Sequence, residues 1–286
     1  MNWQVILLIS VLLYSISIVL QKIILKEENN NPLPFSILFQ LFVGTLILIF
    51  GLLFNAITLP NITPIFLNII IMILLWTFNN LFLYKAIKLS EASKFSILYS
   101  SRALFTILAS SIFLKQSLTI NGYIGTFLII LGIILVSIKS HKLVFKKEDI
   151  YSILAAIGFG FALTNDKFLL GYFNTYTYAS LVFLLPGLFL WIIYPNVTKE
   201  MRFYFQKKTF TKFAFVSTLM TSSIILVYSA LKLSTNSSQF ASINMLTVIL
   251  IVILSMIFLK ERDNMLRKLL GVVLSFVGLL FVASSM

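Results

Sequence analysis

Long stretches without a charged side chain alternate with short polar turns along the whole chain. The longest covers residues 29–84, and its 56 residues would form about 84 Å of helix, enough for two crossings of a ~30 Å hydrocarbon layer. It divides at residues 55–64 (NAITLPNITP), where two prolines mark a turn. Further segments can each hold one span: 1–21, 95–114, 116–138, 150–165, 168–198, 213–231, 233–259 and 269–286. The pattern predicts an all-α integral membrane protein with ten transmembrane helices.

The composition narrows the class of protein. Apolar residues make up 59% of the chain and charged residues 11%, against roughly 25% charged residues in soluble domains, which excludes a soluble enzyme and a disordered chain. There is no Cys, and His141 is the one His, so neither a disulfide nor a His-based metal cluster can be assembled. Walker A, GxSxG and HExxH sequences are absent as well. We therefore expect no cofactor, no bound metal and no enzymatic activity.

Lys and Arg are strongly biased to one side of the predicted helices. Of the 22 basic residues, 18 fall in the loops after the first, third, fifth, seventh and ninth helices, whereas Lys115, Lys167 and Lys232 fall on the other side and Arg102 lies within a helix. Short cytoplasmic loops retain Lys and Arg, so both termini are expected to face away from the cytoplasm, in the plasma (inner) membrane. The alternative is that the basic loops dock anionic lipid or nucleic acid, which their spread over five loops disfavours; we expect no nucleic-acid partner.

The two halves of the chain are similar to each other. Residues 84–90 (YKAIKLS) match 228–234 (YSALKLS) at five of seven positions, and Gly125 and Gly132 match Gly271 and Gly278. The order and nearly constant offset of these matches indicate a duplication, with five-helix repeats at 1–145 and 146–286. Because five is odd, the second repeat enters the membrane from the opposite side. Inverted repeats of this kind provide two related gates around a midplane site and so permit alternating access.

The second half of each repeat carries the best local signal. Residues 86–136 contain FLKQ at 113–116, and residues 230–282 contain FLKE at 258–261, each followed by a helix with two glycines. This pattern resembles the drug/metabolite transporter superfamily, specifically its ten-helix, EamA-type branch. The resemblance implies secondary transport of small metabolites, often amino acids, through a cavity lined by helices 1, 3, 4, 6, 8 and 9. The chain departs from the family pattern at Gln40, Ala103, Gln116 and Val248.

Arg102 is the sharpest candidate for binding a ligand. A cation in the middle of a span costs roughly 2.5–3.5 kcal/mol, so another group must compensate its charge. A substrate carboxylate or phosphate would do so through paired hydrogen bonds from the guanidinium. The alternative is a structural arginine satisfied by carbonyl groups, Asn side chains or water.

Other polar and aromatic side chains within the spans are candidates to surround the same substrate. They are Tyr14, Trp76, Asn79, Asn80, Tyr84, Tyr228 and Asn244. Ordinary hydrogen bonding between helices is their alternative role. Asp166 either binds a coupling proton, forms an interfacial ion pair with Lys167 or is a charge at a helix end. The glycines of the fifth and tenth helices predict that these helices pack closely, away from the substrate.

These features together predict a secondary active transporter of a small polar or anionic metabolite, with an amino-acid-like compound favoured. Its partners would be the substrate, the lipid bilayer and a coupling proton or counter-substrate, and it would act as a monomer or homodimer. The alternatives are a passive channel, a membrane sensor without transport and an intramembrane enzyme. An enzyme would need convergent acids or a nucleophile–base pair, of which the spans contain almost none.

Overall fold

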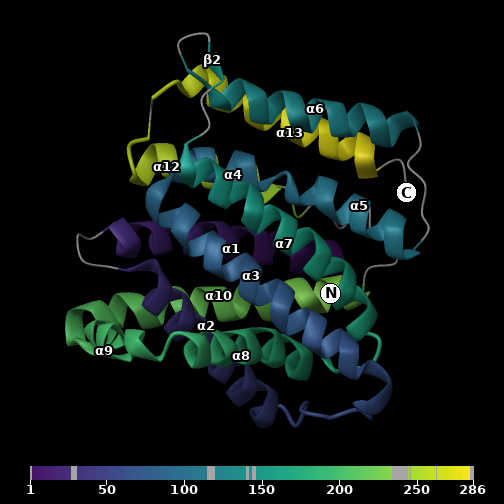
Figure 1. The fold of residues 1–286 in the computed structure, drawn as a ribbon, viewed down its shortest axis with the longest axis vertical. Helices are drawn as coiled ribbons and strands as arrows, with labels where there is room; N and C mark the ends of the chain where they lie inside the picture. The colour runs from purple at the N-terminus through teal and green to yellow at the C-terminus, as the bar shows by residue number, and fades with distance from the viewer. Residues whose placement is uncertain are drawn as a thin grey trace.

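The computed structural model describes residues 2–26, 31–114, 120–139, 142–143, 146–233, 244, 246–261 and 263–283, which are almost entirely helical (Figure 1). Helices of the first half are α1 (Trp3–Lys26), α2 (Pro32–Leu53), α3 (Phe66–Leu89), α4 (Ala92–Tyr99), α5 (Arg102–Leu114) and α6 (Ile120–Ser137). Helices of the second half are α7 (Lys147–Leu169), α8 (Thr175–Ile193), α9 (Thr198–Met201), α10 (Lys207–Leu233), α12 (Leu246–Phe258) and α13 (Met265–Ala283).

Short elements connect some of the helices. They are the 3₁₀ helices η1 (Thr63–Ile65), η2 (Pro195–Val197) and η3 (Arg202–Phe205), and the two-residue strands β1 (Ile138–Lys139) and β2 (Lys142–Leu143). The strands pair antiparallel, with Ile138 opposite Leu143. Proline at the first turn suits η1 and η2, because proline has no N–H to leave unsatisfied there.

Five helices in the described part of the chain are long and apolar enough to cross a membrane: α1, α2, α3 together with η1, α8 and α10. Helix α12 and residues 120–132 of α6 are apolar but shorter. The predicted helical, multi-pass membrane architecture is therefore confirmed. The count of ten crossings stays a prediction.

The predicted fourth span is wrong in one respect, because it consists of two helices. Helix α4 ends and α5 begins around Ser100 and Ser101. Each serine hydroxyl donates to the carbonyl three residues earlier, at Ile97 and Leu98 respectively, over 2.7 Å. The backbone there tightens to three-residue spacing, with Ala103 N donating to Ser100 O over 3.1 Å. Serine hydroxyls that compete for helical carbonyls favour such a break, and the break places Arg102 at the first residue of α5.

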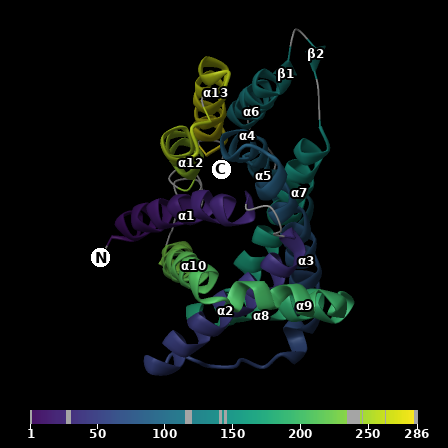
Figure 2. The same cartoon turned by 90° about the vertical axis from the view of Figure 1, so that its left-hand side faces the viewer.

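The helices pack in pairs that join the two halves of the chain. Helix α6 packs along α13, α2 along α8, and α4 against α12. Helix α3 packs on α7, and α1 packs on α10 in the same way. Figures 1 and 2 show α6 and α13 side by side at one edge of the bundle and α1 beside α10 in its middle. The core of the molecule is thus shared between the halves.

Glycine permits the contact between α6 and α13. A Cβ atom added to Gly132 would lie 2.7 Å from Gly271 O, and one added to Gly278 would lie 2.6 Å from Gly125 O. Both distances are shorter than real Cβ contacts, so the two backbones touch through glycine, as the sequence predicts. This pair lies apart from the cavity described below.

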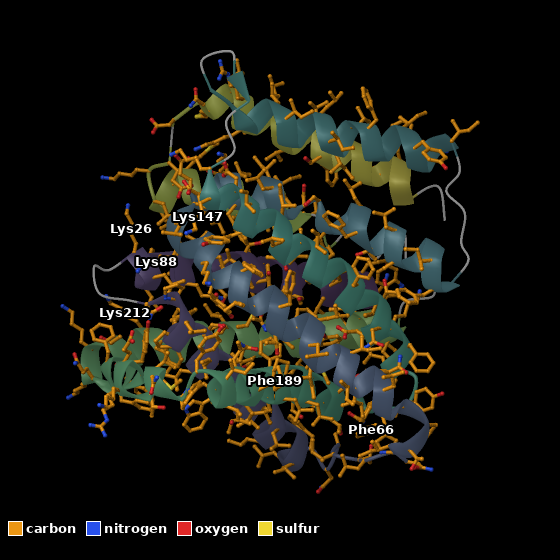
Figure 3. All side chains as sticks on the ribbon, in the orientation of Figure 1. Lys26, Phe66, Lys88, Lys147, Phe189 and Lys212 are labelled. Carbon is orange, nitrogen blue, oxygen red and sulfur yellow. The ribbon has the colours of Figure 1, made fainter. Side chains whose placement is uncertain are left out.

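Lysines gather at one end of the helix bundle. Figure 3 labels Lys26, Lys88, Lys147 and Lys212 at the left-hand end, whereas the N and C labels of Figure 1, drawn in the same orientation, lie toward the right. This separation of the lysines from the chain ends agrees with the distribution of charge along the sequence.

Candidate functional site

A cavity of about 80 Å³ lies inside the bundle between α1, α3, α5, α7 and α10. Its wall consists of Ser10, Tyr14, Trp76, Arg102, Phe159, Leu163, Ser223, Ile224, Val227, Tyr228, Leu231 and Asn244. Five of the candidates taken from the sequence, Tyr14, Trp76, Arg102, Tyr228 and Asn244, therefore lie around one space. A smaller cavity of about 10 Å³ adjoins Tyr14 and Arg102 as well.

Arg102 is the charged residue in the wall of this cavity, and it is 4% exposed. Its guanidinium carbon lies 4.8 Å from the ring centroid of Tyr99 and 4.8 Å from that of Phe159. Two cation–π contacts of this kind contribute roughly 0.5–2 kcal/mol each and fix the plane of the guanidinium. Neither Tyr99 nor Phe159 was a candidate from the sequence. Tyr99 is three residues before Arg102, a spacing that brings side chains together on a helix and is a signal that could have found it.

The hydrogen-bonding capacity of Arg102 is only partly used. Its Nη2 donates to Thr247 Oγ1 over a long 3.4 Å, and its Nε has no hydrogen-bond partner within the described residues. Thr247 lies 145 residues after Arg102, so the bond joins positions that correspond in the two halves of the sequence. A buried guanidinium with a spare N–H is able to hold an anion.

Asp166 lies beside the cavity wall and is fully buried. Its carboxylate accepts hydrogen bonds from Tyr178 OH over 2.6 Å, from Tyr228 OH over 3.0 Å, and from Trp76 Nε1 over 3.1 and 3.2 Å. Asp166 lies in the last turn of α7 with its side chain buried in the bundle, and its role as a proton-binding group or as a partner of Lys167 in an interfacial ion pair stays a prediction. Burying a carboxylate is costly unless hydrogen bonds compensate it, and three donors from three helices do so here.

Tyr178 was not a candidate from the sequence, although its position relative to the turn could have indicated its contact with Asp166. Asp166 and Tyr178 are each six residues from Tyr172, in the turn between α7 and α8. The short turn keeps residues on either side of it close in space, which brings Tyr178 within hydrogen-bonding reach of Asp166.

Three candidates do not line the cavity. Asn79 Nδ2 donates to Tyr99 OH over 3.2 Å and to Ala155 O over 2.7 Å, and Asn80 Nδ2 donates to Gln40 Oε1 over 2.7 Å. The ring of Tyr84 packs at 5.5 Å from that of Phe35. These three side chains hold α3 against its neighbours in the bundle.

The geometry of the helix explains why Trp76 reaches the cavity and the residues that follow it at spacings of four do not. Four residues turn an α-helix by about 40° more than one full turn, so the stripe from Trp76 through Asn80 to Tyr84 winds roughly 80° around α3. Trp76 consequently faces α7 and Asp166, whereas Asn80 and Tyr84 contact α2.

A polar cluster closes the bundle near the start of α4. Glu261, in the turn after α12, accepts hydrogen bonds from Ala92 N over 2.8 Å, Ser93 N over 3.0 Å and Ser93 Oγ over 2.8 Å. Lys268 of α13 forms an ion pair with Glu91, the residue before α4. The second half of the chain thus supplies the cap for a helix of the first half. Gln116, which corresponds to Glu261 in the first repeat, and His141 lie outside the described residues.

No group of three or more Asp, Glu, His or Cys side chains that could hold a metal ion occurs within the residues that the structure describes.

Comparison with known proteins identifies the family to which the sequence is similar. The sequence model of the EamA-like transporter family matches residues 1–138 and 146–284. A solved structure described as "Crystal structure of protein" is similar in fold, with a TM-score of 0.69 and 13% sequence identity over 98% of this chain and 95% of that chain. No curated protein matches the chain.

Proposed function

The chain belongs to the EamA-like transporter family, and from this premise we propose that it is a secondary active transporter of a small anionic metabolite, with an amino-acid-like compound favoured, working by alternating access. The observation that carries the proposal is Arg102, a buried guanidinium with an unpaired N–H in the wall of an internal cavity. Tyr14, Trp76, Tyr228 and Asn244 surround the same space. Transport, rather than chemistry on the substrate, is the activity that this arrangement supports.

Arg102 pairs with the negative group of the substrate in this proposal. Hydrogen bonds that involve a charged group are worth about 1.5–3 kcal/mol each, so a paired contact would dominate the affinity of a small ligand. The rings of Tyr99 and Phe159 both contact the guanidinium and restrict its movement, which lowers the entropy lost when the anion binds.

Ten transmembrane helices arranged as two inverted repeats, 1–145 and 146–286, are the architecture that we propose for alternating access. The pairing of helices supports it: exchanging the halves turns the α3–α7 contact into the α10–α1 contact and leaves the α6–α13, α2–α8 and α4–α12 contacts unchanged. The bond between Arg102 and Thr247 then crosses the axis that relates the repeats. Rocking one repeat against the other would expose the cavity to each face in turn.

The orientation follows the lysines: we place the lysine-rich end in the cytoplasm of a plasma-membrane protein and both termini on the other side. Because the chain has no Cys, single cysteines report accessibility without background. A cysteine at Lys199, in α9, should react with an impermeant maleimide only after cells are opened, and one at Asn61, in the turn before η1, should react in intact cells. The reverse pattern would overturn the orientation.

The driving force that we propose is a coupling proton at Asp166 or a counter-substrate. Asp166 supports the first option because its partners Trp76 and Tyr228 belong to the cavity wall, so a change at the carboxylate reaches the substrate. Tyr178 and Tyr228 are the titratable groups in contact with it, and Lys167 is its neighbour on α7. Uptake driven by a pH gradient should be lost in Asp166→Asn while counterflow persists. Gradient-driven uptake by that variant would show that Asp166 is not the coupling group, and a lack of such uptake in the unaltered chain would leave the counter-substrate option.

Counterflow in proteoliposomes tests the proposed function. A thermal-shift screen of amino acids, organic acids, amines and nucleosides on the purified protein first identifies a ligand. Internal unlabelled ligand should then stimulate uptake of labelled ligand, which a passive channel, a sensor or an enzyme would not produce. Arg102→Ala should abolish saturable uptake, whereas Arg202→Ala, which removes an exposed arginine of η3, should not. Unchanged affinity in Arg102→Ala would refute the anion site.

A further inference from the structure

Most polar atoms in the cavity wall are already engaged with other protein groups. The indole N–H of Trp76 and the hydroxyl of Tyr228 both donate to Asp166, which is not itself part of the wall. These two side chains therefore present their rings, rather than free hydrogen-bonding groups, to a ligand in the cavity. Because the buried carboxylate of Asp166 accepts the hydrogen bonds of Trp76 and Tyr228, the surface that these two residues present to the cavity is apolar.

The two serines of the wall are satisfied by each other. Ser10 Oγ donates to Ser223 O over 2.9 Å, and Ser223 Oγ donates to Ser10 O over 3.0 Å, which joins α1 to α10. The other side chains of the wall, apart from Tyr14, Arg102 and Asn244, are Phe159, Leu163, Ile224, Val227 and Leu231. The lining is thus apolar over most of its extent, and Arg102 supplies its positive charge.

The geometry points to a specific class of ligand, and the inference rests on the proposed transport function. We propose that the cavity binds a small organic monocarboxylate with an apolar body: the carboxylate pairs with Arg102, and the body lies against Trp76, Phe159 and the aliphatic side chains of α10. A second carboxylate or a hydroxyl group on the part of the body that contacts these apolar side chains would have no hydrogen-bond partner among them. One unsatisfied hydroxyl costs about 1–3 kcal/mol, a factor of roughly 5 to 150 in affinity.

The size of the cavity favours a compact body. Its volume of about 80 Å³ is smaller than the ~150 Å³ cavity known to admit benzene. A short branched aliphatic acid therefore needs less movement of the wall than an aromatic acid does. Isovalerate, its neutral isostere isovaleramide and the hydroxylated analogue 3-hydroxyisovalerate form a matched set of probes.

Fluorescence of Trp76 and calorimetry test the inference together. In a chain with Trp3→Phe and Trp191→Phe, Trp76 is the remaining tryptophan, and isovalerate should quench its emission in a saturable manner. Isovaleramide and 3-hydroxyisovalerate should each bind at least fivefold more weakly. Calorimetry on the unaltered chain should give the same order, so the test does not depend on the fluorescence variant. Equal or tighter binding of 3-hydroxyisovalerate would overturn the inference.

Asp166→Asn tests the role of the hidden carboxylate. The amide nitrogen of Asn cannot accept a hydrogen bond, so at least one of the three donors now held by Asp166 loses its acceptor. Two of the three, Trp76 and Tyr228, belong to the cavity wall and would then offer a free N–H or O–H to a ligand. The preference for isovalerate over 3-hydroxyisovalerate should then fall at least fivefold. Asp149→Asn is the matched control, because Asp149 is also a buried acid of α7 but is paired with Lys94 at 2.7 Å, and it should retain the preference. An unchanged preference in Asp166→Asn would contradict the proposed lining.

The results also separate this inference from the proposed function. Should anion counterflow depend on Arg102 while hydroxylated or doubly charged acids bind most tightly, the apolar-body inference fails and the transport proposal stands. Should no carboxylate binding depend on Arg102, both fail.

Discussion

Glu261 offers a direct test of how the two halves of the chain hold each other. Its carboxylate accepts three hydrogen bonds at the start of α4, from Ala92 N, Ser93 N and Ser93 Oγ at 2.8–3.0 Å. We expect Glu261→Ala to destabilise the folded protein and Glu261→Gln to do so by about half as much. The amide of Gln retains one acceptor oxygen, whereas its nitrogen cannot accept from a backbone N–H.

The magnitude follows from the contacts at the helix start. Loss of a side-chain cap costs about 0.5–2 kcal/mol, and loss of a negative charge near a helix N-terminus costs about 0.3–1 kcal/mol. Glu261 is partly exposed, so the sum lies near 2 kcal/mol rather than at its upper limit. At roughly 2–4 °C per kcal/mol, the apparent Tm should fall by about 4–8 °C.

Thermal unfolding of the purified protein in one detergent measures this loss. Glu148→Ala is the control, because Glu148 is also a partly exposed acid in the first turn of a helix but makes only a 3.7 Å ion pair with Lys146. Such a pair is worth about 0–1 kcal/mol and a charge in the first turn about 0.3–1 kcal/mol, so the control should lose about 1 kcal/mol and melt within about 4 °C of the parent. Equal Tm values for Glu261→Ala and Glu148→Ala would refute the capping argument.

Three further changes probe packing and the site. Gly278→Ala places a Cβ 2.6 Å from Gly125 O and should lower the apparent Tm more than Gly171→Ala, whose nearest contact is 3.2 Å; equal melting would contradict the backbone contact. Arg102→Lys keeps the charge but loses the planar stack, so calorimetry should show at least tenfold weaker anion binding, and unchanged affinity would count against the stack. Asn79→Leu leaves two buried partners without a donor and should cost about 1–3 kcal/mol in chemical unfolding; a neutral result would mean that they are hydrated.

Local patterns account for much of the fold. Helix positions follow from uncharged runs because a backbone in hydrocarbon must satisfy its own hydrogen bonds. The glycines of α6 and α13 predict close packing because a missing side chain removes the steric barrier between backbones. The division at Ser100 and Ser101 was missed, although serine is known to compete for helical carbonyls, because the apolar pattern continues through it.

Some residues of the candidate site could likewise be predicted from the sequence, and others could not. Arg102 stands out in the sequence because a charge in an apolar span is costly wherever the span packs. Asn80 and Tyr84 were grouped with Trp76 by a spacing of four, a rule that holds between neighbours but drifts around the helix over longer distances. Phe159 has no distinguishing feature in the sequence. Thr247 is marked there only as a hydroxyl at the repeat position of Arg102, and packing brings both residues to Arg102.

The sequence by itself determined that the chain is helical, lies in a membrane, repeats itself and carries one cation within a span, because each of these properties depends on local composition or on similarity between segments. Only the tertiary structure decided which side chains share a space and which polar atoms remain free in it. Asp166 illustrates the difference, since its burial depends on Trp76, Tyr178 and Tyr228 meeting from three helices. No local sequence pattern predicts these contacts with Asp166, because they result from how the helices pack.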